Sequence, residues 1–219
     1  MDTAALLARS ELFSALDGDA IDKIAAATHP LSLRRNELVF SEGDAATEMY
    51  VVRSGRVAIA NRSIDGRESV MALMENGDLF GEMSMFDGDM RSADARALEP
   101  SDLVAVPFLP VRSVLEERPQ LLWSVVALLV RRLRSTDEAL ADSVFLDVPG
   151  RTAKRLLELA AGADEFVLPV TQEELAGMVG ASRERVNKAI SAFVRLKWLE
   201  QVDRRYRIVD REQLTRRAR

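Results

Sequence analysis

Residues Thr171–Leu196 have the sequence TQEELAGMVGASRERVNKAISAFVRL, and this segment carries the strongest local structural signals in the chain. Thr171 followed three residues later by Glu174 forms a capping-box pattern, which predicts the start of a helix. Gly180 predicts a tight turn, and Ser182 can cap a second helix. Apolar residues recur at helical spacing on both sides of the turn, so the pattern predicts a helix-turn-helix.

The predicted second helix has a polar face that suits base recognition. A recognition helix points its N-terminal residues at base edges in the major groove, where Arg and Lys suit guanine and Glu accepts from cytosine. Two strand-like runs, 197–201 and 204–209, follow around a basic turn and predict a wing whose arginines would contact phosphates. A solvated charged face is the alternative interpretation. The candidate DNA-binding residues are Thr171, Gln172, Ser182, Arg183, Glu184, Asn187 and Lys188.

Charge is distributed unevenly along the 219 residues. Residues 1–144 carry 15 Lys and Arg against 24 Asp and Glu, a net charge of −9, whereas residues 145–219 carry 15 against 11, a net charge of +4. An acidic front and a basic back indicate two domains with different partners, and a basic domain suits DNA. A chance fluctuation of composition is the alternative.

The composition excludes several classes of site. The chain has no cysteine, which excludes disulfides, thiolate nucleophiles, cysteine zinc sites and iron–sulfur clusters. His29 is the one histidine, so a multi-histidine metal site or a Ser–His enzyme would depend on it alone; before Pro30, it is expected at the surface or at a helix end. No run of about 18 apolar residues predicts a membrane span, and the N-terminus lacks a basic signal-peptide region. We therefore expect a cytoplasmic protein.

The front half predicts a β-rich domain. Helical spacing over 5–29 ends at Pro30, and short β-like runs separated by turn signals follow. Asp65-Gly66 is a strong two-residue hairpin signal. Many short strands at such spacing favour a sandwich or barrel. The predicted strands are Glu37–Phe40, Met49–Arg53, Arg56–Ala60, Glu68–Met74 and Leu103–Pro107.

A long helix is predicted from Pro119 to about Asp142. One line of residues steps along it at heptad spacing, as in a coiled-coil dimer, and a second apolar stripe comprises Leu121, Val125 and Leu128. A helix that is apolar on two sides can pack on its own domain with one side and on a second copy with the other; a core helix buried all round in a monomer is the alternative. The heptad line, here called the seam, is Leu122, Val126, Leu129, Leu133, Thr136 and Leu140.

The densest polar constellation of the front half is Phe80–Ala93, FGEMSMFDGDMRSA. Gly81 allows close backbone approach, and one helical turn over 82–86 would offer free N–H groups to an anion. Arg91 can donate to phosphate oxygens, and Glu82 can accept from a sugar hydroxyl. These groups together describe a sugar-phosphate pocket. The alternative is local structure, with Glu82 as a cap and Arg91 paired to a nearby aspartate.

Three motifs together carry a family resemblance: Phe80–Ala93, the DVPGR of Asp147–Arg151, and the GASRERVNKA of Gly180–Ala189. On these, the chain resembles the cyclic-AMP receptor protein family, which also includes the anaerobic iron–sulfur regulators, and looks like its actinobacterial members. The resemblance covers nearly the whole chain. It implies an α+β fold, with an N-terminal double-stranded β-helix (jelly-roll) cyclic-nucleotide-binding domain, a long dimerisation helix and a C-terminal winged helix-turn-helix. The corresponding boundaries are 1–118 for the first domain, 119–142 for the helix, 143–150 for a hinge and 151–219 for the DNA-binding domain.

The resemblance also implies the ligand and the residues that hold it. The ligand would be cyclic AMP (cAMP), an allosteric effector rather than a catalytic cofactor, with no metal, haem or iron–sulfur cluster. Glu82 would bind the ribose 2′-hydroxyl. Arg91 and Ser92 would hold the cyclic phosphate, with Gly81 and Met83 beside it.

The adenine end and the DNA reader depart from the family pattern at one residue each. Thr136 would meet the adenine from across the seam. Asp137 stands where the family has Ser or Asn; it can accept from the adenine amino group but adds a negative charge. Arg183 and Glu184 match base-reading positions, whereas Lys188 stands where several members have Arg.

The partners implied are double-stranded DNA, a cyclic nucleotide, a second copy of the chain and RNA polymerase, without a membrane and without catalysis. The DNA site would be a two-fold sequence of the type TGTGA–six bases–TCACA. One alternative is a regulator of the same fold that needs no ligand, its pocket being vestigial. Another is a sensor of a different nucleotide such as cyclic GMP. A third, from another class, is a cupin-like metalloenzyme, for which the single histidine provides too few ligands.

Overall fold

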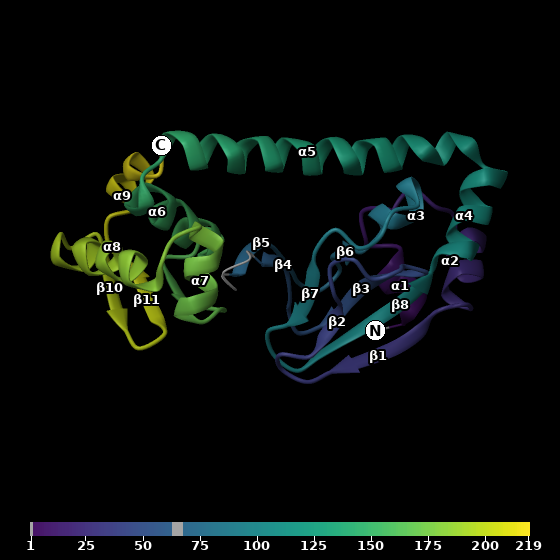
Figure 1. Ribbon diagram of the computed structural model, residues 1–219, viewed down its shortest axis with the longest axis horizontal. Helices are drawn as coiled ribbons and strands as arrows, with labels where there is room; N and C mark the ends of the chain where they lie inside the picture. Colours follow the sequence, from purple (N-terminus) through teal and green to yellow (C-terminus); the bar gives the residue numbers. More distant parts are fainter. Residues whose placement is uncertain (1, 63–67) are drawn as a thin grey trace. The chain divides into compact units, whose positions relative to one another are not determined.

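The computed structural model describes residues 2–62 and 68–219 (Figure 1). The chain forms two compact units: residues 2–61 and 71–133 form the first, and residues 134–219, together with Arg62 and residues 68–70, form the second, so one division between them falls within a long helix. The predicted hairpin turn at Asp65-Gly66 lies outside the described residues. No helix in the described part of the chain is long and apolar enough to cross a membrane.

The first unit is built on two antiparallel four-stranded sheets, as the turn spacing predicts. The first sheet has the order β1-β8-β3-β6, with β1 (His29–Leu33), β8 (Ser101–Pro107), β3 (Glu48–Ser54) and β6 (Leu79–Phe80). The second has the order β2-β7-β4-β5, with β2 (Leu38–Phe40), β7 (Asp94–Ala97), β4 (Val57–Arg62) and β5 (Glu68–Met74).

Strand β3 is buried on both faces, which explains its continuous apolar sequence, MYVV. Tyr50 and Val52 join a core between the two sheets, whereas Met49 and Val51 join a second core on the opposite face. Side chains alternate between the faces of a strand, so one strand serves both cores. Helices cover that opposite face: α1 (Thr3–Leu7), α2 (Gly18–Ala25), α4 (Phe108–Glu117), the 3₁₀ turn η1 (Pro119–Leu121) and the start of the long helix α5 (Leu122–Phe145).

Part of the N-terminal prediction is wrong. Helical spacing over 5–29 becomes two short helices, and the strand β1 already begins at His29. Pro30 is tolerated because β1 is an edge strand, where proline does not break an interior ladder. His29 is therefore exposed at a strand start, with Nε2 3.5 Å from Glu48 Oε2, rather than at a helix end.

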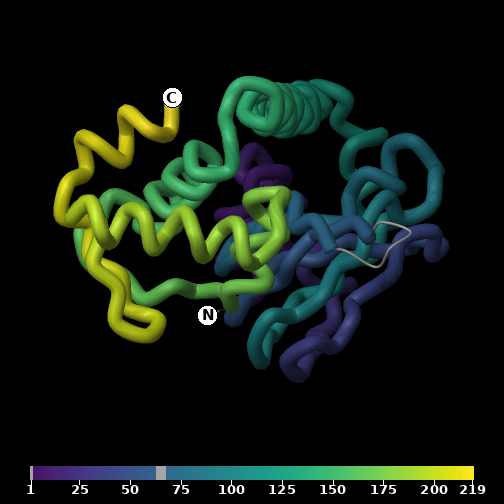
Figure 2. The backbone as a smooth tube through the Cα atoms, turned by 60° about the vertical axis from the view of Figure 1, so that its left-hand side comes forward, coloured from purple at the N-terminus to yellow at the C-terminus, as the bar shows by residue number. Residues whose placement is uncertain are grey.

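Helix α5 has the two apolar sides that its sequence predicts. Val125 and Leu128 are buried in the helix-covered core of the first unit. The apolar residues of the seam are exposed on the single chain. Figure 1 shows α5 from the side as one continuous helix, and Figure 2 views it nearly along its axis.

The predicted hinge, 143–150, is much shorter in the structure. Helix α5 continues to Phe145 and α6 (Val148–Leu159) begins two residues later. The Asp147 side chain caps α6 by accepting from the Gly150 amide at 2.9 Å. Pro149 lies in the first turn of α6, where its missing N–H costs nothing. Proline and glycine here start a helix instead of forming a loop.

The second unit contains the predicted winged helix-turn-helix. The capping box of Thr171 and Glu174 is present, and Gly180 ends the first helix in the left-handed region, with φ of 66°. Tyr206 and Phe166 stack in the small sheet at 5.6 Å between ring centroids. The elements are α7 (Gln172–Val179), α8 (Arg183–Arg195), the sheet of β9 (Glu165–Val167), β10 (Leu199–Val202) and β11 (Arg205–Ile208), and α9 (Arg211–Arg217).

Candidate functional site

The segment Phe80–Ala93 folds around Gly81, where any other residue would be strained. Gly81 has φ of 77°, and a Cβ atom there would lie 2.7 Å from Arg91 Nη1 and 3.3 Å from the Phe40 ring. Helix α3 (Met83–Asp87) follows directly, so the predicted helical turn is present, one residue later than expected. The tight backbone at Gly81 therefore lets the arginine approach the start of this helix.

Arg91 is buried inside the first unit, with 5% of its surface exposed. Its Nη1 donates to the Gly81 carbonyl and its Nη2 to the Glu48 carbonyl, both at 2.6 Å. The guanidinium carbon lies 4.0 Å from the centroid of the Phe40 ring. Burial lowers the pKa of Arg91, but an arginine remains protonated in a protein. Its buried Nε has no hydrogen-bond partner among the described residues, so the site holds a cation with an unused donor.

Glu82 is fully buried, and its carboxylate is only partly satisfied. Oε1 accepts from Arg132 Nη1 at 2.5 Å, while the buried Oε2 has no hydrogen-bond partner among the described residues. Burial raises the pKa of Glu82, and the charge of Arg132 opposes this rise. A buried acceptor without a donor is costly unless something supplies one, as a ligand hydroxyl would.

The other predicted pocket residues are placed in two groups. Met83 and Ser92 lie at the same site, with Ser92 Oγ 3.9 Å from the Met83 sulfur. Thr136 and Asp137 are exposed on α5, in the part of the helix that belongs to the second unit. The structure thus brings Gly81, Glu82, Met83, Arg91 and Ser92 together within one chain.

Sequence reasoning missed the residues that support this pocket. Arg132 pairs with Glu82 from fifty residues away, and Phe40 lies against the Arg91 guanidinium. Tyr50 donates from its hydroxyl to Glu48 Oε1 at 2.9 Å; burial, assisted by Glu48, raises its pKa to about 12 and keeps it a neutral donor. In the sequence, only its position beside the apolar stripe of the long helix could have indicated that Arg132 lies close to the first unit.

The polar face of α8 that the sequence predicts to contact bases is open. Arg183, Glu184 and Lys188 are exposed and Asn187 is half-buried, and in the described part of the chain no hydrogen bond or ion pair occupies their side chains. They lie in the first two turns of α8, whose start is fixed by Ser182 accepting from the Arg185 amide. These four polar side chains are near the N-terminal end of the helix, and none of them is paired within the described part of the chain. They are therefore suited to contact base edges.

Thr171 and Gln172 have structural contacts of their own. Thr171 Oγ1 accepts from the Glu174 amide, and Gln172 Nε2 donates to the Tyr206 hydroxyl at 2.6 Å. Among the predicted wing arginines, Arg204 donates to the Leu168 carbonyl at 2.9 Å, whereas Arg205, the first residue of β11, has an exposed side chain. The wing is held to its domain by the pairing of β11 with β9 and by the contacts between Arg204 and Leu168, and the Arg205 side chain is exposed to solvent.

The described residues contain no group of three or more His, Asp or Glu side chains that could hold a metal ion. The polar groups gathered at the predicted site are instead one buried cation, Arg91, one buried carboxylate, Glu82, and the hydroxyl of Ser92. That set suits a small anion joined to a hydroxyl-bearing group.

Comparison with known proteins identifies a domain in each half of the chain. Residues 30–118 match the cyclic nucleotide-binding domain, and residues 150–217 match the Crp-like helix-turn-helix domain. The chain is 38% identical to a CRP-like cAMP-activated global transcriptional regulator of Mycobacterium tuberculosis, over 98% of this chain and 99% of the relative. It is 33% identical to the cAMP-activated global transcriptional regulator CRP of Pasteurella multocida, over 68% of this chain and 74% of the relative.

A solved structure shows the same architecture. The catabolite activator protein of Thermus thermophilus is similar with a TM-score of 0.55 and 29% identity, over 95% of this chain and 98% of that one. The full-length similarity to the mycobacterial regulator and the two matching domains identify the family directly. The chain therefore belongs to the CRP family of transcription regulators, with a cyclic nucleotide-binding domain followed by a Crp-like helix-turn-helix domain.

Proposed function

We propose that this protein is a cAMP-responsive, sequence-specific DNA-binding regulator that acts as a homodimer on a palindromic site of the TGTGA–six bases–TCACA type. The observation that carries the proposal is the cluster of buried polar groups around Arg91 and Glu82 in the first unit. There, a buried arginine and a buried glutamate each keep one polar atom without a partner among the described residues. The relatives named above, both called cAMP-activated, support the choice of ligand.

The chemistry of the pocket matches a cyclic nucleotide. Arg91 would donate to the exocyclic oxygens of the phosphate, with the Ser92 hydroxyl as a second donor. Glu82 Oε2 would accept from the ribose 2′-hydroxyl, which satisfies the buried lone pairs. Arg132 would remain on Oε1 and keep the carboxylate ionised. Each unsatisfied atom of the pocket thus receives a partner from one part of the ligand.

The exposed face of α5 supports the homodimer. A chain that folded alone would leave the apolar residues of the seam in water along several helical turns. Heptad spacing is the pattern by which two helices bury such residues against each other. In a parallel pair of α5 helices, Thr136 and Asp137 of the partner subunit would reach the adenine. The Thr136 hydroxyl and the Asp137 carboxylate would both face the amino group of the adenine.

The regulatory mechanism would be a shift of population between two dimer arrangements. A ligand shifts such an equilibrium only if it binds one state more tightly. Nucleotide held by Glu82 and Arg91 of one subunit and by the seam of the other would favour one pairing of the α5 helices. That pairing would hold the two α8 helices about 34 Å apart, which is one turn of DNA. RNA polymerase would then be recruited or blocked at the bound site.

A calorimetric titration of the purified protein with cAMP tests the proposal, with cyclic GMP and the Arg91→Leu variant as controls. We expect saturable binding near one nucleotide per subunit for the wild type, weaker binding of cyclic GMP, and none for Arg91→Leu, whose dimer should persist. If neither cAMP nor cyclic GMP bound, the cAMP assignment would be overturned. The Asp137 charge would then favour a regulator of the same fold that binds DNA without a ligand.

A further inference from the structure

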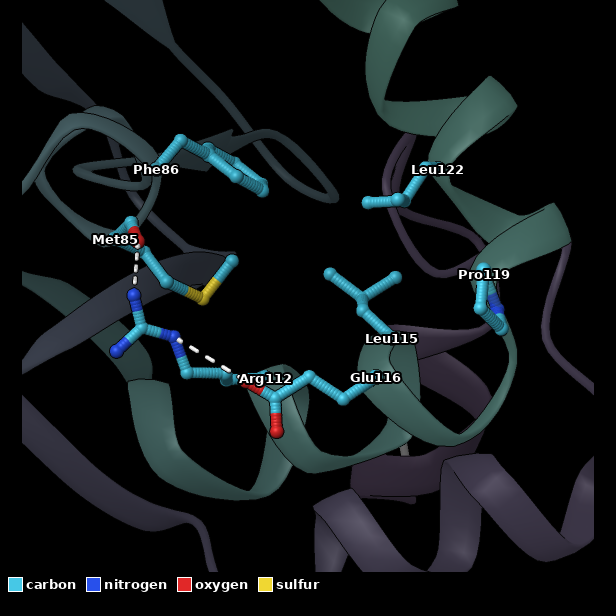
Figure 3. A pocket seen from close by; sticks show the side chains of 7 residues that line it. All are labelled: Met85, Phe86, Arg112, Leu115, Glu116, Pro119 and Leu122. Atoms are coloured by element: carbon cyan, nitrogen blue, oxygen red, sulfur yellow. Dashed lines mark hydrogen bonds and ion pairs between the residues drawn. The ribbon is translucent and has the colours of Figure 1, made fainter.

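A hollow lies beside the start of α5, apart from the nucleotide pocket. Its volume is about 250 Å³. Figure 3 shows the side chains of Met85, Phe86, Leu115 and Leu122 pointing toward it from three elements, α3, α4 and α5. Arg112 and Glu116 form its polar rim, with Arg112 Nε 4.0 Å from Glu116 Oε1. The hollow is thus an apolar groove with an ionic edge, here called the α3–α4 groove.

The α3–α4 groove adjoins the seam. Leu122 is both the first residue of the seam and one wall of the groove. In the proposed homodimer, the seam is covered by a second copy of the chain. Because the groove continues the seam, the same second copy is the partner expected to fill it.

One large side chain beside the groove has nothing to cover it on a single chain. Trp123 is 76% exposed, although tryptophan is a residue whose burial contributes strongly to interfaces. If Leu122 and Val126 occupy the d and a positions of the heptad, Trp123 occupies an e position, at the edge of the seam. The residues Val130 and Val144 share this line and are also exposed.

Heptad geometry directs this tryptophan at the groove of the other subunit. In a parallel pair of helices, an e residue lies opposite the g residue that precedes it by five positions in the partner. For Trp123 that position is residue 118. Arg118 is not helical, since α4 ends at Glu117 and the turn η1 begins at Pro119. At residue 118 the chain therefore forms a turn instead of a further turn of α5. The α3–α4 groove, which Pro119 lines, lies beside this turn.

We propose that the partner subunit's Trp123 inserts into the α3–α4 groove, and that this pair of reciprocal contacts anchors the N-terminal end of the dimer. The indole ring would lie on Phe86, Leu115 and Leu122. The Glu116 carboxylate on the rim would accept from the indole N–H, the hydrogen bond that a buried tryptophan requires. The inference rests on the homodimer proposed above and adds the groove and its occupant.

The first test uses Trp123 as its own reporter. The chain has two tryptophans, so Trp198→Phe leaves Trp123 as the only one. Sedimentation and tryptophan emission are measured on the same samples over a dilution series. We expect the dimer to show blue-shifted emission that is protected from acrylamide, and the emission to shift to the red as the dimer dissociates. A dimer whose Trp123 emission is that of a solvated indole would overturn the inference.

The second test measures dimer dissociation in variants of the intact chain. Trp123→Ala should raise the dissociation constant on the order of tenfold or more, because truncating an interface tryptophan removes a large buried contact. Trp123→Phe should recover part of the affinity. Leu109→Ala is the matched control, because Leu109 is equally exposed at 76% but lies on α4 outside the groove. It should leave the constant unchanged.

A double-mutant cycle connects the tryptophan to the groove. Combined with Trp123→Ala, the Phe86→Ala variant should lose much less affinity than it does alone, since both residues belong to the same contact. A wild type that is dimeric but insensitive to Trp123→Ala would overturn the groove inference and leave the homodimer standing. A wild type that is monomeric at every concentration would overturn both.

Discussion

Replacing Arg132 with Met removes the ion pair that opposes the upward shift of the Glu82 pKa. The pair joins a fully buried Glu82 to an arginine whose side chain is 34% exposed. Removing one member of a buried pair costs about 3–5 kcal/mol because the other charge is left without a partner. Water screens the exposed side of Arg132, so we expect a loss of about 2–3 kcal/mol in the free energy of unfolding at pH 7. The hydrogen bond from Arg132 to the Leu79 carbonyl, 2.8 Å long, is lost as well.

The sign of the pH dependence follows from the pKa of Glu82. Burial raises this pKa above the ordinary value of 4.5, and loss of Arg132 should raise it further. The folded variant then binds a proton more tightly than the unfolded chain, so its stability falls as the pH rises from 4.5 through the folded-state pKa. Arg132→Met should therefore lose more stability at pH 8 than at pH 5.

Urea denaturation at the two pH values measures this effect, at one protein concentration so that dimer dissociation does not contribute differently. The control is the double variant Glu82→Gln/Arg132→Met, in which no buried charge remains. It should recover stability at pH 8 relative to Arg132→Met and lose the extra pH dependence. If Arg132→Met were as stable as the wild type, or equally destabilised at both pH values, Glu82 would not be a buried carboxylate held by Arg132.

Three further predictions concern the core, the seam and the two ligand sites. Leu128→Ala should destabilise the fold by about 2–5 kcal/mol, since Leu128 is fully buried, whereas Leu129→Ala should spare the single chain and weaken the dimer; chemical denaturation and sedimentation separate the two effects. Arg183→Ala should cost about 1–3 kcal/mol in DNA binding and relax one position of each half-site; an unchanged consensus after binding-site selection would contradict a base-reading role. Arg91→Lys keeps the charge but loses the planar fork, and calorimetry should show cAMP binding that is weaker than in the wild type but measurable, unlike in Arg91→Leu.

The DNA-binding domain could be predicted from sequence because its signals are local. The capping box at Thr171, the turn at Gly180 and the cap at Ser182 each involve neighbours within a few residues, and the structure confirms all three. The pocket segment was recognisable for the same reason. Gly81, Glu82 and Arg91 lie close together in the sequence. An arginine suits a phosphate and a glutamate suits a sugar hydroxyl, so the residue types themselves indicate the ligand.

The missed features depend on contacts between distant segments. Strand β7 has the sequence DARA, without β-branched or aromatic residues, and exists because it pairs with β2 and β4. Arg132 looks like an ordinary solvated charge on a long helix until the fold places it against Glu82. The hinge was predicted too long because Pro149 and Gly150 suit a loop equally well; only the cap from Asp147 assigns them to a helix.

The most direct test of the account is DNA affinity with and without cAMP. A labelled duplex carrying TGTGA–six bases–TCACA is titrated with the protein at fixed salt, and binding is followed by fluorescence anisotropy. We expect saturating cAMP to tighten binding about tenfold or more, within the usual range of allosteric coupling, and to have no effect on Arg91→Leu. Equal DNA affinity with and without cAMP, in a wild type that binds cAMP, would contradict the claim that the pocket controls the DNA-binding domain.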